Sequence, residues 1–397
     1  MIWIAAAAAA CVLVACGGGS SSSLPWLGSI AGAQASSVPA VQVTPVGMRV
    51  ENSPVPVKGA DGLVHLTYEL ELGNFTNAVA TLSRLDVIDA ATGNAVATLQ
   101  PADIANRLVV RDKAAVPGSI GAAQQGLLYL HVSFADQSSV PATLAHRATV
   151  TLGDSQLVET AARIAVAPAA TLVVGAPLRG SNFIAGDGCC DSTRHVRATL
   201  PLNGQQYTAQ RFAIDWELLD SQGRIYVGDP KLPASYLIYG QSIYSVAPGT
   251  VVAVLDGLPD SPPGALPASL PIEQADGNHV VVDLGGGRFA LYAHMQPGSV
   301  KVHVGDAVRE GDVLGLVGTS GNSSEPHLHF HISDGPTLAS NGLPYLMRSF
   351  SGSRRGVSTA AFDQAIIDGK PIATEAVAQP GPRSNVMPMD LWIVDLP

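Results

Sequence analysis

The chain has 397 residues, of which 47% are hydrophobic, so it is long enough for more than one folded core and too apolar to be disordered throughout. Charged residues make up only 14%, while 41 glycines and 28 prolines favour a turn-rich, mainly β protein over one built from long charged helices. The net charge of −10 is spread along the chain, without a cluster of Lys and Arg that could neutralise phosphates, so we expect no nucleic-acid partner.

The N-terminal segment begins with an apolar run, which ends at Cys16. The run is shorter than the roughly 20 residues that span a bilayer and is typical of a signal peptide, which we place at 1–15. Leu-Val-Ala-Cys before and at Cys16 resembles the lipobox of bacterial lipoproteins, although no Lys or Arg precedes the run. The resemblance implies a lipid anchor on Cys16 and a place in the cell envelope, facing the periplasm at the outer membrane. The Gly/Ser-rich composition that follows predicts a flexible tether over 16–40.

Residues 41–168 alternate apolar and polar positions, as in LVHLTYELEL and GLLYLHVSF, with turn signals between the alternating segments. Short strands at this spacing predict an antiparallel β-sandwich of the immunoglobulin-like type. His65, His131 and His146 sit singly in the strand patterns, and we expect them to be satisfied, half-buried residues rather than ligands. The sequence predicts no sharper role for this domain than spacing, docking or partner binding.

Strand patterns continue through a second domain, which we place at 169–350. Its first residues, within 167–188, are interpreted as a connector from the first domain. A proline-rich insertion at 258–271 interrupts the strand patterns, and we expect a surface loop that walls a cleft. Helical periodicity is confined to 359–369, inside a C-terminal extension over 351–397 whose apolar end we expect to pack on the second domain.

The segment HLHFH places three histidines on alternate positions. In a strand, His327, His329 and His331 share one face while Leu328 and Phe330 point into a core. Such a row of imidazoles forms a chelating or a catalytic edge.

Several motifs around this segment occur in a recognisable order: QRFAIDW (210–216), TVVAVLDG (250–257), LYAHM (291–295) and GTSGNSSEPHLHFHI (318–332). Together, over about 190–345, they resemble the lysostaphin/LytM-type zinc metallopeptidases that cut peptide crosslinks in bacterial cell walls. The resemblance implies an antiparallel β-sheet peptidase domain with a Zn²⁺ cofactor. The chemistry agrees, because amide hydrolysis needs an activated water and a Lewis acid, and zinc with three protein ligands and an open position supplies both.

The resemblance also implies roles for individual residues. Asp215 and His329 match zinc ligands, and His327 matches the general base that handles the attacking water. His294, in LYAHM, matches a histidine that helps to stabilise the tetrahedral intermediate. His331 matches no required position, and we expect it at the rim of the site.

The third ligand departs from the family pattern HxxxD, because Arg211 occupies the histidine position and a guanidinium has no lone pair for a metal. Strand alternation would place Arg211 and Asp215 on one face. Either His195, just upstream, completes the triad, or Arg211 pairs with Asp215 and replaces the cation, as in degenerate LytM domains that activate cell-wall amidases. We favour a metal site, because the other four site residues are retained together.

The remaining cysteines are the adjacent pair Cys189 and Cys190, for which an exported, oxidising setting favours a structural disulfide over a redox or metal role. His279 and His303 are interpreted as surface or half-buried residues. The sequence as a whole predicts a zinc endopeptidase that acts on the peptide stems of peptidoglycan. The alternative is a non-hydrolytic scaffold that binds cell wall, an amidase or another envelope protein.

Overall fold

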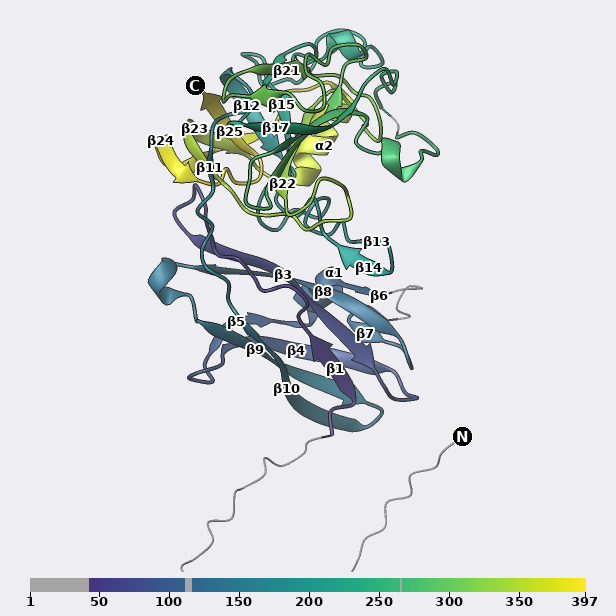
Figure 1. The fold of residues 1–397 in the computed structure, drawn as a ribbon. Helices are drawn as coiled ribbons and strands as arrows, with labels where there is room; N and C mark the ends of the chain where they lie inside the picture. Colours follow the sequence, from purple (N-terminus) through teal and green to yellow (C-terminus); the bar gives the residue numbers. More distant parts are fainter. Residues whose placement is uncertain (1–42, 111–115, 265) are drawn as a thin grey trace, which may run out of the picture. The chain divides into compact units, whose positions relative to one another are not determined.

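The computed structural model describes residues 43–110, 116–264 and 266–397 (Figure 1). The predicted signal peptide, the tether and the lipid-anchor residue Cys16 therefore lie outside the described residues. Residues 44–397 form one structural unit. None of the helices in the described ranges is both long and apolar enough to cross a bilayer.

Two antiparallel sheets make up the N-terminal part of this unit. The first contains, in spatial order, β1 (Val46–Arg49), β3 (Val64–Asn74), β8 (Gln125–Phe134) and β6 (Leu108–Val110), with β2 (Val57–Lys58) beside β3. The second contains β10 (Ser155–Ala165), β9 (Thr143–Leu152), β4 (Ala80–Asp89) and β5 (Ala95–Leu99), with β7 (Ser119–Ile120) beside β4. A short helix, α1 (Pro101–Arg107), follows β5.

The two sheets enclose a common core. Leu66, Tyr68 and Leu70 of β3 are fully buried in one apolar cluster with Leu82 and Leu85 of β4. Because alternate residues of a strand share a face, the alternation in the sequence directly produces this buried layer. The two-sheet arrangement agrees with the predicted sandwich, while its immunoglobulin-like type stays a prediction.

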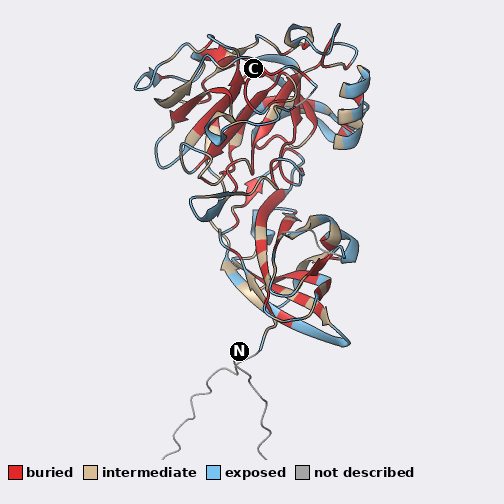
Figure 2. Ribbon diagram, turned by 90° about the vertical axis from the view of Figure 1, so that its right-hand side faces the viewer, coloured by how far each residue is buried: buried red, intermediate tan, exposed pale blue. Residues whose placement is uncertain are grey.

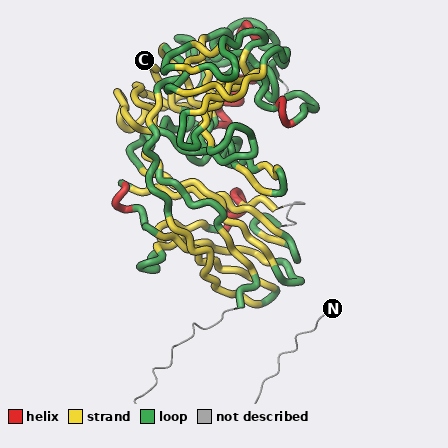
Figure 3. Tube along the Cα trace, viewed as in Figure 1, coloured by secondary structure: helices red, strands yellow, loops and turns green. Residues whose placement is uncertain are grey.

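A large sheet forms the C-terminal part and carries the histidine-rich strand. Its strands, in spatial order, are β11 (Val173–Val174), β23 (Leu346–Gly356), β25 (Trp392–Leu396), β12 (Gly180–Gly186), β15 (Ile214–Leu218), β22 (Leu328–Ser333), β19 (Phe289–Met295), β18 (Asn278–Asp283), β17 (Gly249–Leu255) and β20 (Ala307–Val308), with β24 (Thr374–Val386) beside β23. The C-terminal part also contains two small two-stranded sheets and a helix (Figure 3). The small sheets pair β13 (Leu200–Leu202) with β14 (Gln205–Tyr207) and β16 (Ser242–Tyr244) with β21 (Val313–Leu316), and the helix is α2 (Thr359–Asp368). The prediction of a mainly β protein with antiparallel sheets is confirmed.

Two segments differ from the sequence-based expectation. The predicted connector at 167–188 contains β12, which pairs with both β15 and β25 in the middle of the large sheet. The predicted extension at 351–397 supplies most of β23 and all of β24 and β25, so it is an integral part of that sheet. Its helix, α2, is found where periodicity predicted one, between the N-cap Ser358 and the left-handed Gly369.

One face of the large sheet packs on an apolar core. Leu328 and Phe330 of β22 are fully buried there with Trp216 of β15 and Tyr292 of β19, as the sequence predicted for the first two. Figure 2 shows buried residues along the strands of both parts of the chain. The histidines that alternate with Leu328 and Phe330 therefore emerge on the opposite face.

A buried ion pair joins β3 to the segment before β15. The Arg211 guanidinium donates to the Glu69 carboxylate and, over 2.6 Å, to Thr208 Oγ1. Burial raises the pKa of Glu69, and the charge of Arg211 opposes that rise. Removing one member of a buried pair leaves the other charge uncompensated, which costs far more than the loss of an exposed pair.

We predict that Arg211→Ala lowers the free energy of unfolding by about 3–5 kcal/mol, because Glu69 loses its partner. Urea unfolding followed by tryptophan fluorescence measures the effect. The matched control, Arg49→Ala, removes an exposed pair with Glu71 on the same strand and should cost at most about 1 kcal/mol. Equal costs for the two variants would contradict the prediction, and replacing both members, as Arg211→Met with Glu69→Leu, should cost less than Arg211→Ala.

Candidate metal centre

Asp215 lies at the centre of a group of imidazoles on the face of the sheet away from the core. In the antiparallel pairing of β15 with β22, it is directly opposite His329, and its Oδ1 lies 2.8 Å from His329 Nδ1. Its Oδ2 lies 3.3 Å from His195 Nε2, and its Oδ1 lies 3.5 Å from His327 Nε2. Both carboxylate oxygens are thus in contact with ring nitrogens.

The electrostatics of this group favour a carboxylate beside a cation. Burial opposes ionisation of Asp215, but His195 and His327 outweigh it and hold the pKa of Asp215 well below its usual range. Burial likewise opposes the charge on His195, but the neighbouring carboxylate raises the pKa of His195 to about 9. His195 therefore keeps its proton beside the Asp215 carboxylate, and a metal cation could supply that positive charge instead.

Backbone carbonyls fix the orientation of three of the rings. The Nδ1 atoms of His195, His327 and His294 lie 3.0, 2.8 and 2.8 Å from the carbonyl oxygens of Asp187, Glu325 and Ser320. An Nδ1–H that donates to a carbonyl leaves the Nε2 lone pair free in the neutral imidazole, which is the arrangement found at metal-ligating histidines.

The donor set fits a zinc ion. His195, Asp215 and His329 offer ligand atoms that all lie within 4.8 Å of one another, and His294, His327 and His329 form a second such group. Zinc bonds of 2.0–2.2 Å in tetrahedral geometry separate neighbouring ligand atoms by about 3.3 Å. Two imidazoles and one carboxylate leave the fourth position open for water, as catalytic zinc sites require. The ligand roles predicted for these residues remain a proposal.

Arg211 does not lie at this group, which corrects the alternative in which it pairs with Asp215. It precedes β15 in a turn, so the strand alternation that would put Arg211 and Asp215 on one face does not apply. Its guanidinium is held instead by Glu69 and Thr208.

His331 is not a rim residue, and that prediction is wrong. Its side chain is buried, and its Nδ1 lies 2.9 Å from His329 Nε2. If His329 binds a metal through Nδ1, its Nε2–H donates to His331. The alternate spacing of the two histidines on one strand face is the sequence signal that could have predicted this contact.

His294, the last residue but one of β19, has an uncommon backbone conformation, with a φ of 61°. Its carbonyl accepts from Gly318 N, and its own N–H donates to the carbonyl of Asp276. The loops that provide these contacts approach so closely that a Cβ on Gly321 would lie 2.3 Å from Gly277 N. A strained, non-glycine left-handed residue that neighbouring loops over-determine is typical of functional sites.

The insertion at 258–271 lines a pocket of about 420 Å³. Its walls are mainly apolar and include Leu258, Pro262, Leu266 and Gly321. One lining residue, Gly321, follows Ser320, whose carbonyl oxygen lies 2.8 Å from His294 Nδ1. The predicted surface loop does border a cavity.

The structure also places the other residues that the sequence analysis named. His279 is half-buried and His303 is exposed, as expected. Cys189 and Cys190 form the predicted disulfide. His65 and His131 do not sit singly, however, because His65 Nδ1 lies 2.9 Å from His131 Nε2.

Comparisons with known proteins identify the family that part of this chain resembles. Residues 236–340 match the model of peptidase family M23, a range that includes His294, His327 and His329 but not His195 or Asp215. A cell division protein, DipM, from Caulobacter vibrioides is 37% identical over 68 residues, which are 17% of this chain and 11% of that protein.

Two solved structures are among those that are similar to this chain. The catalytic domain of the prophage-encoded M23 protein EnpA from Enterococcus faecalis is 22% identical, with 42% of this chain and 92% of that chain covered and a TM-score of 0.25. The catalytic domain of lysostaphin from Staphylococcus simulans is 19% identical, with coverages of 38% and 80% and a TM-score of 0.22. Scores this low add no argument to the sequence match. Residues 236–340 thus match peptidase family M23, and the resemblance drawn from the motifs is confirmed.

We predict that His195→Ala lowers the affinity for Zn²⁺ by about 100-fold or more, because a ligand matters more than the outer contacts whose loss costs 10–100-fold. Competition with a fluorescent zinc chelator measures the affinity. His303→Ala, which removes an exposed imidazole, should leave it unchanged. An unchanged affinity in His195→Ala would exclude His195 as the third ligand.

We also predict that His331→Ala lowers zinc affinity by about 10–100-fold, because His329 loses the acceptor that orients its ring. In His331→Gln the side-chain carbonyl can accept the same hydrogen bond, so part of the affinity should return. The same competition assay applies, and equal affinities for the alanine variant and the wild type would show that His331 does not orient His329.

Proposed function

We propose that this protein is a zinc-dependent endopeptidase that hydrolyses peptide crosslinks of bacterial peptidoglycan. The single observation that carries the proposal is the convergence of one carboxylate and four imidazoles, those of Asp215, His195, His294, His327 and His329. Three of these residues suit a metal, and the other two imidazoles lie beside them with their Nδ1 atoms held by backbone carbonyls. The family M23 match supports a peptidase, and the substrate and the metal are part of the proposal.

Bound zinc would supply a Lewis acid for the scissile carbonyl and a water of lowered pKa. The chain's own residues then handle the protons. His327 Nδ1 donates to Glu325 O, so its Nε2 can accept the proton of the attacking water and later return it to the leaving amine. Because Nε2 lies 3.5 Å from Asp215 Oδ1, the carboxylate would stabilise the imidazolium formed in between.

His294 has a different environment. Burial, reinforced by His327 and His329, lowers the pKa of His294 well below its usual range, so the ring is neutral at pH 7. Its Nδ1–H is committed to Ser320 O, which leaves Nε2 as an acceptor. In this form His294 orients water, and it can donate to an oxyanion only after it takes up a proton.

The surroundings suit an extended peptide. The pocket at the 258–271 insertion has a mainly apolar lining that includes Asp260, and in this proposal it takes up part of the peptide stem. In this proposal the lipid anchor expected at Cys16 would keep the enzyme in the cell envelope, on the periplasmic side of the outer membrane.

The test is the release of soluble muropeptides from purified peptidoglycan, separated by chromatography and identified by mass. We expect activity that a chelator abolishes and Zn²⁺ restores, and that His327→Ala reduces by about 100-fold or more, the range of general-base catalysis. His303→Ala is the matched control. Metal binding without any cleaved crosslink would reject the enzyme and support the non-hydrolytic scaffold instead.

A further inference from the structure

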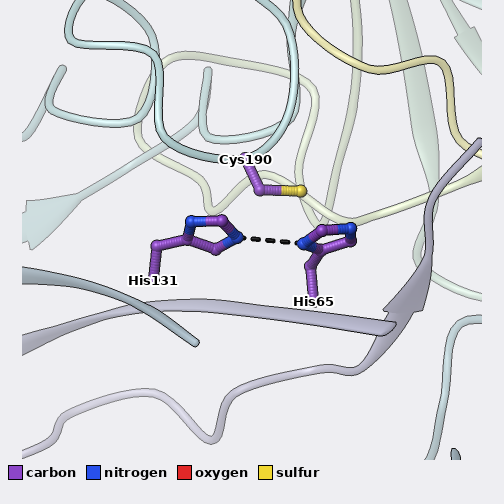
Figure 4. A group of neighbouring side chains, drawn as sticks. All are labelled: His65, His131 and Cys190. Carbon is purple, nitrogen blue, oxygen red and sulfur yellow. Dashed lines mark hydrogen bonds between the residues drawn. The ribbon is translucent and has the colours of Figure 1, made fainter. Parts of the chain in front are cut away.

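A second group of metal-ligating side chains lies outside the site described above. His65 of β3 and His131 of β8 face each other, with 2.9 Å between His65 Nδ1 and His131 Nε2. Figure 4 shows the side chain of Cys190 beside the two rings. The three potential ligand atoms all lie within 4.8 Å of one another.

The backbone explains why the two histidines meet. In the antiparallel pairing of β3 with β8, His131 is opposite Thr67 and His65 is opposite Ser133, so the two imidazoles are diagonal neighbours on one face. Thr67 Oγ1 donates to the carbonyl of Cys190 over 2.9 Å, which fixes the cysteine above that face. All three positions are therefore held by main-chain or strand geometry.

Each ring also has a carboxylate near its remote nitrogen. His65 Nε2 lies 3.1 Å from Asp61 Oδ1, and His131 Nδ1 lies 3.9 Å from Asp191 Oδ2. Carboxylates behind the rings orient metal-ligating histidines and raise their basicity. Asp191 is itself held by two hydrogen bonds from Arg107. The group thus has the outer contacts of a metal site as well as the ligands.

We propose that His65, His131 and the thiolate of Cys190 bind a second transition-metal ion of the zinc class once the Cys189–Cys190 disulfide is reduced. A dithiol supplies the two electrons and two protons: the bond between the two sulfurs breaks, each cysteine becomes a thiol, and the dithiol closes to its own disulfide. On metal binding, Cys190 releases its proton to solvent.

The ligand chemistry explains the dependence on reduction. A thiolate is a strong zinc ligand, whereas a sulfur engaged in a disulfide is not available as one. Two imidazoles and one thiolate, with water in the fourth position, match zinc and its close relatives, and the ligand atoms would need separations of about 3.3–3.6 Å. The distance of 2.9 Å between the two ring nitrogens must therefore increase slightly to admit an ion.

The position of this site connects it to the first one. Cys190 lies in the segment from Asp187 to His195, and the carbonyl of Asp187 accepts from His195 Nδ1. A metal on Cys190 would tie strands β3 and β8 to the segment that brings His195 to Asp215. The proposal does not depend on the function proposed above, because it concerns metal binding at separate residues.

Cobalt tests the proposal, because Co²⁺ replaces Zn²⁺ and its bond to a thiolate gives a near-ultraviolet charge-transfer band. The full-length chain carries Cys11→Ser and Cys16→Ser, so that only the adjacent pair can supply thiols. We expect the band to be absent in the oxidised protein and to appear, with one additional Co²⁺ per chain, after reduction. A phosphine is the reductant, because a dithiol would itself bind cobalt.

Two single substitutions provide a matched pair. Cys189→Ser leaves Cys190 as a permanent thiol, so the band and the additional ion should appear without reductant. Cys190→Ser should abolish both under all conditions, and so should His65→Ala. Circular dichroism on each variant, and the comparison of oxidised with reduced protein, separate a lost site from a lost fold.

Three results would overturn the proposal: no thiolate band in the reduced protein or in Cys189→Ser, a band that survives in Cys190→Ser, or a band of equal intensity in folded His65→Ala. A missing first-site metal would count against the peptidase without affecting this outcome, since the band reports only the sulfur ligand.

Discussion

The register of β15 against β22 is the constraint on which the site depends. It sets Asp215 directly opposite His329, and it also places Ile214 and Trp216 beside Phe330 and Leu328 in the core. A slip of one residue would turn every side chain of the strand to the other face, which would bury the carboxylate among apolar groups and expose an indole. Apolar packing on one face of the sheet therefore positions the polar chemistry on the other.

The remaining candidate ligand, His195, is positioned by loop contacts rather than by strand register. His195 is carried by a segment without regular secondary structure, whose position depends on contacts from distant parts of the chain. Arg194 pairs with Asp187 and with Asp363 of α2, while Asp191 pairs with Arg107 at the end of α1. The sandwich and the C-terminal helix thereby both contribute to placing one imidazole, which gives each of them a structural task in the site.

The ion pair between Arg211 and Glu69 explains why Arg211 is compatible with a metal centre at Asp215. Its guanidinium donates to Glu69 and Thr208 rather than to Asp215, so it does not fill the site. Arg211, which occupies the usual ligand position, joins β3 to the turn that precedes β15. The chain thus departs from the HxxxD motif at Arg211, while His195, Asp215 and His329 still offer the two imidazoles and one carboxylate that suit zinc.

The sequence by itself determined whatever depends on local spacing. Period-two alternation predicted the strands, the HLHFH segment predicted a row of imidazoles on one face, and the order of motifs predicted the family. It failed for β12, because a short strand rich in glycine and polar residues shows no alternation, and it misjudged His331, whose burial depends on neighbouring strands.

Only the tertiary structure decided the contacts between residues far apart in the chain. The local sequence does not show whether His195 or Arg211 is the neighbour of Asp215. It also does not show that His65 contacts His131, or that residues after 350 supply strands of the large sheet. Sequence periodicity reports which face a side chain occupies, whereas the partner across that face is set by strand register and loop packing, which only the folded chain defines.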